Sequence, residues 1–73
     1  MTEAYQERVM VERAELDDKV QKLIRFIAGA GYQNLEFAEQ VLLVEQLAFM
    51  EAYRRVLDAR IERWPLLTSG LAD

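Results

Sequence analysis

Two arginines are the first candidates for chemistry, because each interrupts a row of mostly apolar residues. The first row is Gln6, Val9, Arg13, Leu16, Val20, Leu23 and Ile27, and the second is Leu43, Leu47, Met50, Arg54, Leu57, Ile61 and Trp64. If the rows pack antiparallel with Leu23 beside Leu43 or Val44, Arg13 lies opposite Arg54. Two guanidinium groups that face each other in an apolar layer are costly unless negative charge lies between them.

Two explanations of this arginine layer stay open. In the structural one, Glu12, Glu51 or Asp58 supplies the negative charge, or both arginine side chains extend outward to solvent. In the functional one, the layer is an anion site, most naturally for phosphate, because the guanidinium fork matches phosphate oxygens.

A neighbouring row contains Gln46, Tyr53 and Arg60. If the layer is an anion site, these residues favour a nucleotide as the anion. Tyrosine and arginine stack on a nucleobase, and glutamine hydrogen-bonds its edge. Taken singly, each of these residues fits the interior or rim of a helix contact equally well. The candidate ligand contacts are Arg13, Tyr53, Arg54 and Arg60.

The residue inventory argues against catalysis. The chain of 73 residues has no histidine and no cysteine, and its hydroxyl nucleophiles are Ser69, Thr2 and Thr68, all near the ends. This excludes the usual zinc sites, thiol nucleophiles, disulfides and Ser-His-Asp triads. Carboxylate pairs such as Asp17 and Asp18 are typical of a solvated helix face. We expect a non-enzymatic protein that uses neither cofactor nor metal.

The charge balance limits the partners. A net charge of −4 is unfavourable for duplex DNA, which requires a basic face. The sequence does not begin with the charged segment followed by an apolar segment that is typical of a signal peptide. The most apolar stretch, 41–50, is too short to span a bilayer. A soluble, intracellular protein is expected.

Helix-forming residues predict an all-α chain with two long helices. The first should cover about 3–28 and end at Gly29 and Gly31, since glycine readily adopts the left-handed conformation that ends a helix. After a loop at about 29–34, with Asn34 as N-cap, the second should cover about 35–64 and stop at Pro65. We expect residues 65–73 to form a separate tail that is not helical at its start and is docked on its own hairpin or on a neighbouring copy.

A six-residue connection favours an antiparallel two-helix hairpin. The second helix is apolar over most of its circumference, and a hairpin covers only one face of each helix. Chains of this size rarely bury enough core alone. We therefore expect a helical-bundle homo-oligomer whose interface residues are Leu42, Val44, Ala48, Phe49, Ala52 and Val56.

The pattern as a whole resembles small proteins of tailed phages, including crAss-like phages. The resemblance rests on the segments 5–9, 15–17 and 22–27, and on Glu39–Gln40, Leu42–Leu43, Gln46–Leu47, Met50, Tyr53, Val56–Leu57, Arg60–Ile61 and Trp64. The hairpin architecture is also similar to phage anti-CBASS and anti-Thoeris sponges, which are small, oligomeric and non-enzymatic. That likeness implies sequestration of an immune nucleotide signal in the cytoplasm of the host cell.

Three functions follow from these observations. The first is a counter-defence protein that binds a cyclic nucleotide or another phosphate-bearing signal where hairpins meet. The second is an acidic protein-interaction module or inhibitor, comparable to an anti-CRISPR protein. The third is a structural phage component.

Overall fold

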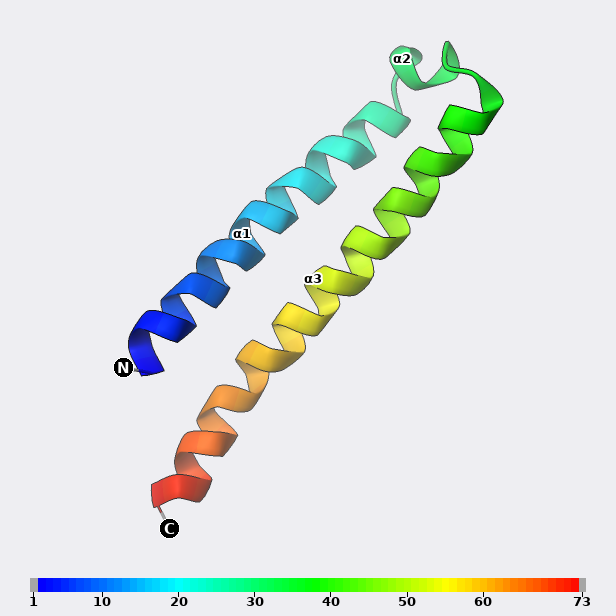
Figure 1. Cartoon of the computed structure of the whole chain (residues 1–73). Helices are drawn as coiled ribbons and strands as arrows, with labels where there is room; N and C mark the ends of the chain where they lie inside the picture. Colours follow the sequence, from blue (N-terminus) through cyan, green and yellow to red (C-terminus); the bar gives the residue numbers. More distant parts are fainter. Residues whose placement is uncertain (1, 73) are drawn as a thin grey trace.

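The computed structural model describes the backbone of residues 2–72 and the side chains of residues 4–64. The elements are α1 (Thr2–Ile27), the single-turn α2 (Ala30–Gln33) and α3 (Phe37–Ala72). Helices α1 and α3 lie side by side and run in opposite directions, and α2 lies at the end where the chain turns (Figure 1). Residues 2–72 contain no strand, which confirms the predicted all-α class.

The two predicted rows meet between α1 and α3. Val9, Leu16, Val20 and Leu57 are buried, and Leu47, Met50, Ile61 and Trp64 pack against them. Every other residue of the two rows is partly buried. Val20 and Leu57 are fully buried, which stabilises the fold by about 1.5–3 kcal/mol for each side chain.

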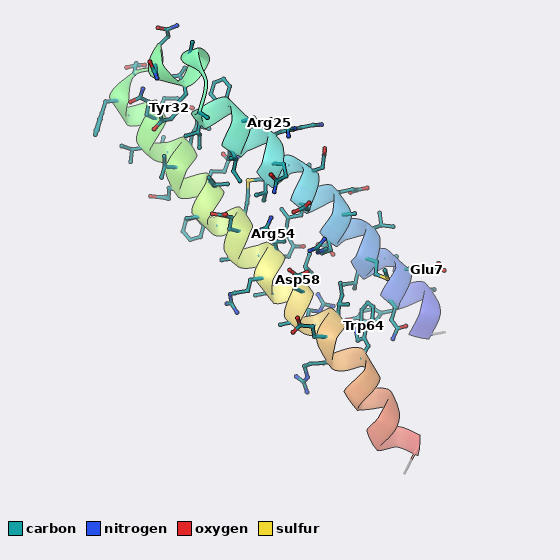
Figure 2. All side chains as sticks on the ribbon, turned by 180° about the vertical axis from the view of Figure 1, so that it is seen from behind. Glu7, Arg25, Tyr32, Arg54, Asp58 and Trp64 are labelled. Atoms are coloured by element: carbon teal, nitrogen blue, oxygen red, sulfur yellow. The ribbon has the colours of Figure 1, made fainter. Side chains whose placement is uncertain are left out.

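Outside their mutual contact, the surfaces of α1 and α3 differ in the kinds of side chain that they expose. Half of the exposed residues of α1 are charged, and several large apolar side chains are exposed beside them: Tyr5, Met10, Val11, Ile24 and Phe26. Helix α3 has a smaller share of exposed charged residues and leaves more large apolar side chains exposed: Phe37, Val41, Leu42, Val44, Phe49, Tyr53 and Val56. Figure 2 shows the described side chains on the two helices, with Glu7 and Arg25 on α1 and Arg54, Asp58 and Trp64 on α3. A single chain therefore covers one apolar face of α3 and leaves another open.

The turn between the long helices is built differently from the prediction. Gly29 has φ −101° and ψ 176°, and none of the described residues has a positive φ, so the expected left-handed glycine cap was wrong. Helix α1 ends instead when the Gly29 amide donates to the Phe26 carbonyl at 3.0 Å, and the extended Gly29 then starts α2. Asn34 was wrong as the N-cap of the second long helix. Asn34 ends α2, and its backbone amide donates to the backbone carbonyl of Ala30 at 3.3 Å.

Two contacts hold this turn against the long helices. Gln40 donates its side-chain amide to the Tyr32 carbonyl at 2.8 Å, and the Tyr32 hydroxyl donates to the Gln40 carbonyl at 3.5 Å. The Phe26 ring lies close over Gly31, where an added Cβ would be 3.1 Å from a ring carbon. Glycine at this position allows the α1 end and α2 to approach closely.

The predicted end of the second helix at Trp64 was also wrong, because α3 continues through Pro65 to Ala72. Proline has no amide hydrogen to donate to the Ile61 carbonyl, so α3 lacks one helical hydrogen bond at this point. Helix α3 thus extends beyond the N-terminal end of α1 (Figure 1). Docking of the 65–73 side chains lies outside the described residues, and the division of the chain after residue 64 stays a prediction.

Candidate functional site

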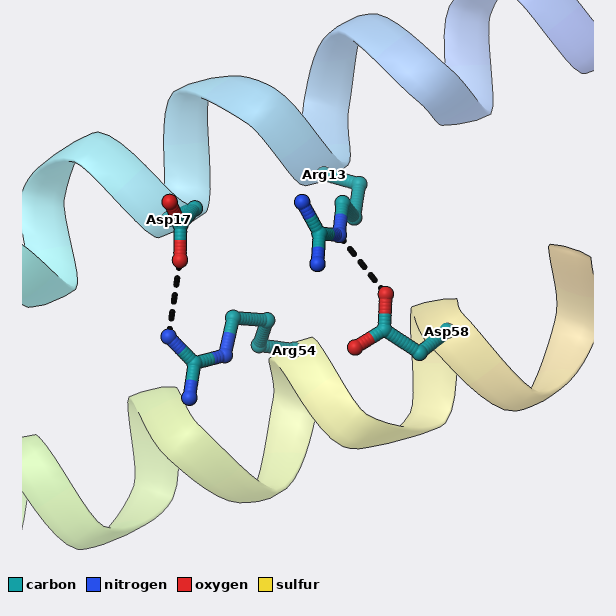
Figure 3. Close-up of polar contacts among 4 residues, drawn as sticks. All are labelled: Arg13, Asp17, Arg54 and Asp58. Atoms are coloured by element: carbon teal, nitrogen blue, oxygen red, sulfur yellow. Dashed lines mark hydrogen bonds and ion pairs between the residues drawn. The ribbon is translucent and has the colours of Figure 1, made fainter.

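The two candidate arginines between α1 and α3 belong to a quartet of alternating charges. Arg13 Nε donates to Asp58 Oδ1 at 2.6 Å, and Arg54 Nη1 donates to Asp17 Oδ1 at 2.8 Å. Both ion pairs cross from one helix to the other, and the two arginines occupy diagonal corners (Figure 3). Each arginine thus has a carboxylate partner on the facing helix.

This geometry identifies the partners of the two arginines. Arg13 is paired with Asp58 and Arg54 with Asp17, and no described contact joins the two arginines to each other. Asp58 was among the three acids considered as the source of negative charge, whereas Asp17 was missed. The structural explanation, in which nearby acids neutralise the arginines, is the one that these contacts match.

A short repeated pattern could have revealed the quartet from the sequence. Both helices contain Arg-x-x-Leu-Asp, at 13–17 in α1 and at 54–58 in α3. Residues four apart lie on the same face of a helix, so each arginine has its aspartate on its own helix one turn away. When two such helices pack antiparallel, each arginine meets the other helix's aspartate, and Leu16 and Leu57 are buried beside them.

The quartet is only half-covered, yet it affects ionisation. The hydrogen bond from Arg13 holds the pKa of Asp58 below its ordinary value, and the positive charges of Arg13 and Arg54 act in the same direction. The same hydrogen bond raises the pKa of Arg13. Both groups are therefore charged at neutral pH, and the four formal charges sum to zero.

The arginines of the quartet keep donors that the aspartates do not use. A guanidinium has five N–H donors. Each of these arginines makes a single hydrogen bond to its aspartate among the described contacts, through Nε in Arg13 and Nη1 in Arg54. The side chain of Arg13 is 40% exposed and that of Arg54 is 25% exposed, so an anion can reach the remaining donors.

The other two candidate ligand residues lie elsewhere. Arg60 donates to the hydroxyl of Tyr5, and its guanidinium carbon is 5.6 Å from the centre of the Tyr5 ring. Tyr5 of α1 was missed in the sequence, where nothing marked it as a partner of Arg60. Tyr53 is exposed and, with Gln46 and Phe49, lines a shallow groove of about 490 Å³ on α3. No described contact joins Tyr53 to the quartet or to Arg60.

The expected interface residues all lie on the exposed surface of this single chain. They are Leu42, Val44, Ala48, Phe49, Ala52 and Val56. Among the residues that the structure describes, no three potential metal ligands of the His, Cys, Asp or Glu type come together. Within that same part of the chain, no helix has the length and apolarity needed to cross a membrane.

Comparison with known proteins places this chain among small phage proteins. Residues 3–63 match the model of the Sequestin family. An "uncharacterized 7.5 kDa protein in denB-rIIB intergenic region" of Enterobacteria phage T4 is 34% identical over 61 residues, which covers 84% of this chain and 95% of that protein. No solved structure matches the chain. The resemblance to small phage proteins is confirmed at this level, and the chain belongs to the Sequestin family.

Proposed function

We propose that this protein is a non-enzymatic phage accessory protein that binds and sequesters a nucleotide-derived immune signal, as a homo-oligomer, in the host cytoplasm. The observation that carries the proposal is the family match over residues 3–63, because the name Sequestin indicates sequestration. A stoichiometric binder needs affinity and copy number rather than catalytic groups. The absence of histidine and cysteine from the chain agrees with that requirement.

The shape of the single chain favours binding between copies. Specific small-molecule sites are concave and bury most of the ligand's surface. The groove beside Tyr53 is open and shallow, so a second surface has to close it before a nucleotide is enclosed. Two hairpins that meet on this face provide such a surface. The resemblances to anti-defence sponges and to proteins of crAss-like phages, which were drawn from the sequence, are part of this proposal.

Within such a pocket, Tyr53 and Gln46 are the base-recognising candidates, and Arg13, Arg54 and Arg60 are the candidates for phosphate. Tyr53 is exposed and offers a ring face for stacking. The unused guanidinium donors of Arg13 and Arg54 suit phosphate oxygens, although Asp17 and Asp58 compete for them. Phosphate binding at the quartet therefore has to overcome two neighbouring negative charges.

Titration calorimetry with cyclic dinucleotides and cyclic ADP-ribose isomers tests the proposal directly. Saturable binding should be accompanied by a dose-dependent rise in melting temperature, because a ligand that binds only the folded state stabilises it. The double variant Arg13→Leu/Arg54→Leu should fold and lose this response. The control Arg8→Leu/Arg25→Leu removes the same charge from exposed positions of α1 and should keep it.

The competing aspartates allow a second, independent readout. Asp17→Asn/Asp58→Asn keeps the side-chain volumes and removes both negative charges, so it should strengthen binding of a phosphate-bearing ligand. Unchanged or weaker binding would place the ligand away from the quartet. If no phosphate-bearing compound gives a saturable response at millimolar concentration, the nucleotide proposal is wrong.

A second candidate function rests on the acidic surface of α1. Glu7, Glu12, Glu15 and Asp18 are all exposed on this helix, and the chain has a net charge of −4. Such a surface suits an inhibitor that docks on a basic nucleic-acid channel of a host protein. A pull-down from host lysate, with Glu12→Lys/Glu15→Lys as the matched variant, should recover a basic partner only with the unmodified chain. A purely structural phage component should recover none.

A further inference from the structure

The exposed surface of α3 contains a second regular seam, which we call the outer seam. It consists of Ala38, Leu42, Glu45, Phe49, Ala52, Val56 and Ala59, spaced alternately by four and three residues. All seven residues are exposed, and Phe49 at its centre is 68% exposed. An alternation of four and three is the spacing at which side chains interlock between paired helices.

Helix α1 cannot cover this outer seam, because it already packs on a different face of α3. The row of α3 that faces α1, which we call the inner row, runs from Leu43 to Trp64. Its member Leu57 belongs to the core, and Met50 and Trp64 pack against that core. Phe49 and Val56 each precede an inner-row residue by one position, so they point about 100° away around the helix. The outer seam is apolar except for Glu45. A long, exposed and mostly apolar strip on a small protein marks an interaction surface.

The charges along α3 indicate what covers the outer seam. Before Arg54, α3 contains Glu39, Glu45 and Glu51 and no basic residue. From Arg54 to Trp64, α3 contains four arginines and two acids, Asp58 and Glu62, so this part is net basic. Arg54 is paired with Asp17, and Arg60 contacts Tyr5.

Arg55 and Arg63, the other two arginines, are exposed and make no ion pair within the described side chains. The acidic half of one α3 is thus complementary to the basic half of another copy that runs antiparallel. In a parallel arrangement, Glu45 would lie beside Glu45 and Arg55 beside Arg55, and like charges would meet.

We propose that two copies of this protein pair through the outer seam, α3 against α3, antiparallel and with the two-fold axis beside Phe49. In this register Leu42 of one copy lies beside Val56 of the other, and Glu45 lies close to Arg55 of the other. The alanines of the outer seam let the two backbones approach closely. Helix α1 then lies on the outside of the dimer, and the groove lined by Phe49 and Tyr53 is closed at the contact.

Disulfide cross-linking tests both the surface and the direction, because the chain has no cysteine of its own. A disulfide requires the two Cα atoms to lie within about 7 Å of each other. Phe49→Cys should therefore cross-link to itself across the axis. Leu42→Cys and Val56→Cys should each cross-link poorly alone and efficiently when mixed. Val11→Cys, at an equally exposed position of α1, sets the background rate.

The outcomes separate the alternatives without any ligand, so failure of this contact is distinguished from failure of ligand binding, which calorimetry measures. A monomer would also contradict the homo-oligomer part of the proposed function, on which this inference rests. If Leu42→Cys alone cross-links as fast as the mixture, the helices run parallel and the proposal is overturned. Cross-linking of the three outer-seam variants, mixed or alone, at the background rate overturns it as well. Because Phe49→Cys removes a large apolar side chain from the contact, light scattering of the unmodified chain is the second measurement. A monomer mass of 8.5 kDa at micromolar concentration contradicts the dimer, and a multiple of twice that mass supports it.

Discussion

Arg54 of α3 donates a hydrogen bond to Asp17 of α1 at 2.8 Å, and Arg13 and Asp58 repeat the same relationship in reverse. Because both pairs arise from one Arg-x-x-Leu-Asp pattern, the contact between the helices has an approximate internal two-fold symmetry. The two pairs fix how far α1 is displaced along α3. They also hold the four charges in alternation, which leaves no net charge at the centre of the contact.

Reversing one charge of the quartet should weaken the fold, and reversing both members of a pair should restore it. Asp17→Arg brings a third positive charge beside Arg13 and Arg54, so the melting temperature should fall by several degrees, equivalent to about 1 kcal/mol. The double variant Asp17→Arg/Arg54→Asp should recover most of that loss. Asp18→Arg, at an exposed neighbouring position, should have a smaller effect in circular-dichroism melts. A double variant no more stable than Asp17→Arg would show that the pair does not fix the helix alignment.

Acid should remove the contribution of Asp58 to stability. The pKa of Asp58 is lower in the folded protein than its ordinary value, chiefly because Arg13 donates a hydrogen bond to it. A carboxyl whose pKa is lowered by folding stabilises the protein above its unfolded pKa, and this stabilisation is lost as the pH falls below about 4. Urea midpoints measured between neutral and acidic pH should therefore fall less steeply in Asp58→Asn than in the unmodified chain. Parallel curves for the two proteins would contradict this role.

The buried row of α1 should dominate its contribution to folding. Val20→Ala removes two carbon atoms from a fully buried site, and the free energy of unfolding should fall by about 2 kcal/mol. Val11→Ala makes the same chemical change on the same helix at a side chain that is 55% exposed, and its effect should be within about 0.5 kcal/mol. Equal losses in chemical denaturation would mean that Val11 is covered in solution by another copy.

A charge on the outer seam should dissociate the assembly. Ala52→Glu would bury an unpaired carboxylate between two α3 helices, which is strongly unfavourable. Light scattering should show a smaller mass for this variant, while the matched change Ala14→Glu on the exposed surface of α1 should leave the mass unchanged. If Ala52→Glu keeps the mass of the unmodified protein, this row faces solvent.

The sequence by itself determined the long helices and the rows along which they meet. Helix formation depends on local propensity, and the alternating spacing of Val9, Leu16 and Val20 marks one face whatever its partner. The inner row of α3 followed from the same reasoning, as did the apolar character of its outer surface. The helix ends were less well predicted, because Gly29 and Pro65 each permit more than one backbone path.

Only the tertiary structure decided the displacement of α1 along α3, and with it the partners of the candidate arginines. Apolar rows with a repeating spacing can slide by one turn and still bury similar side chains, so polar pairs select the alignment. Arg13 therefore meets Asp58 instead of Arg54, although both arginines lie in the rows where the sequence placed them. The position of Arg60 against Tyr5 was decided in the same way, because a contact between residues so distant in the sequence depends on the packing of the two helices.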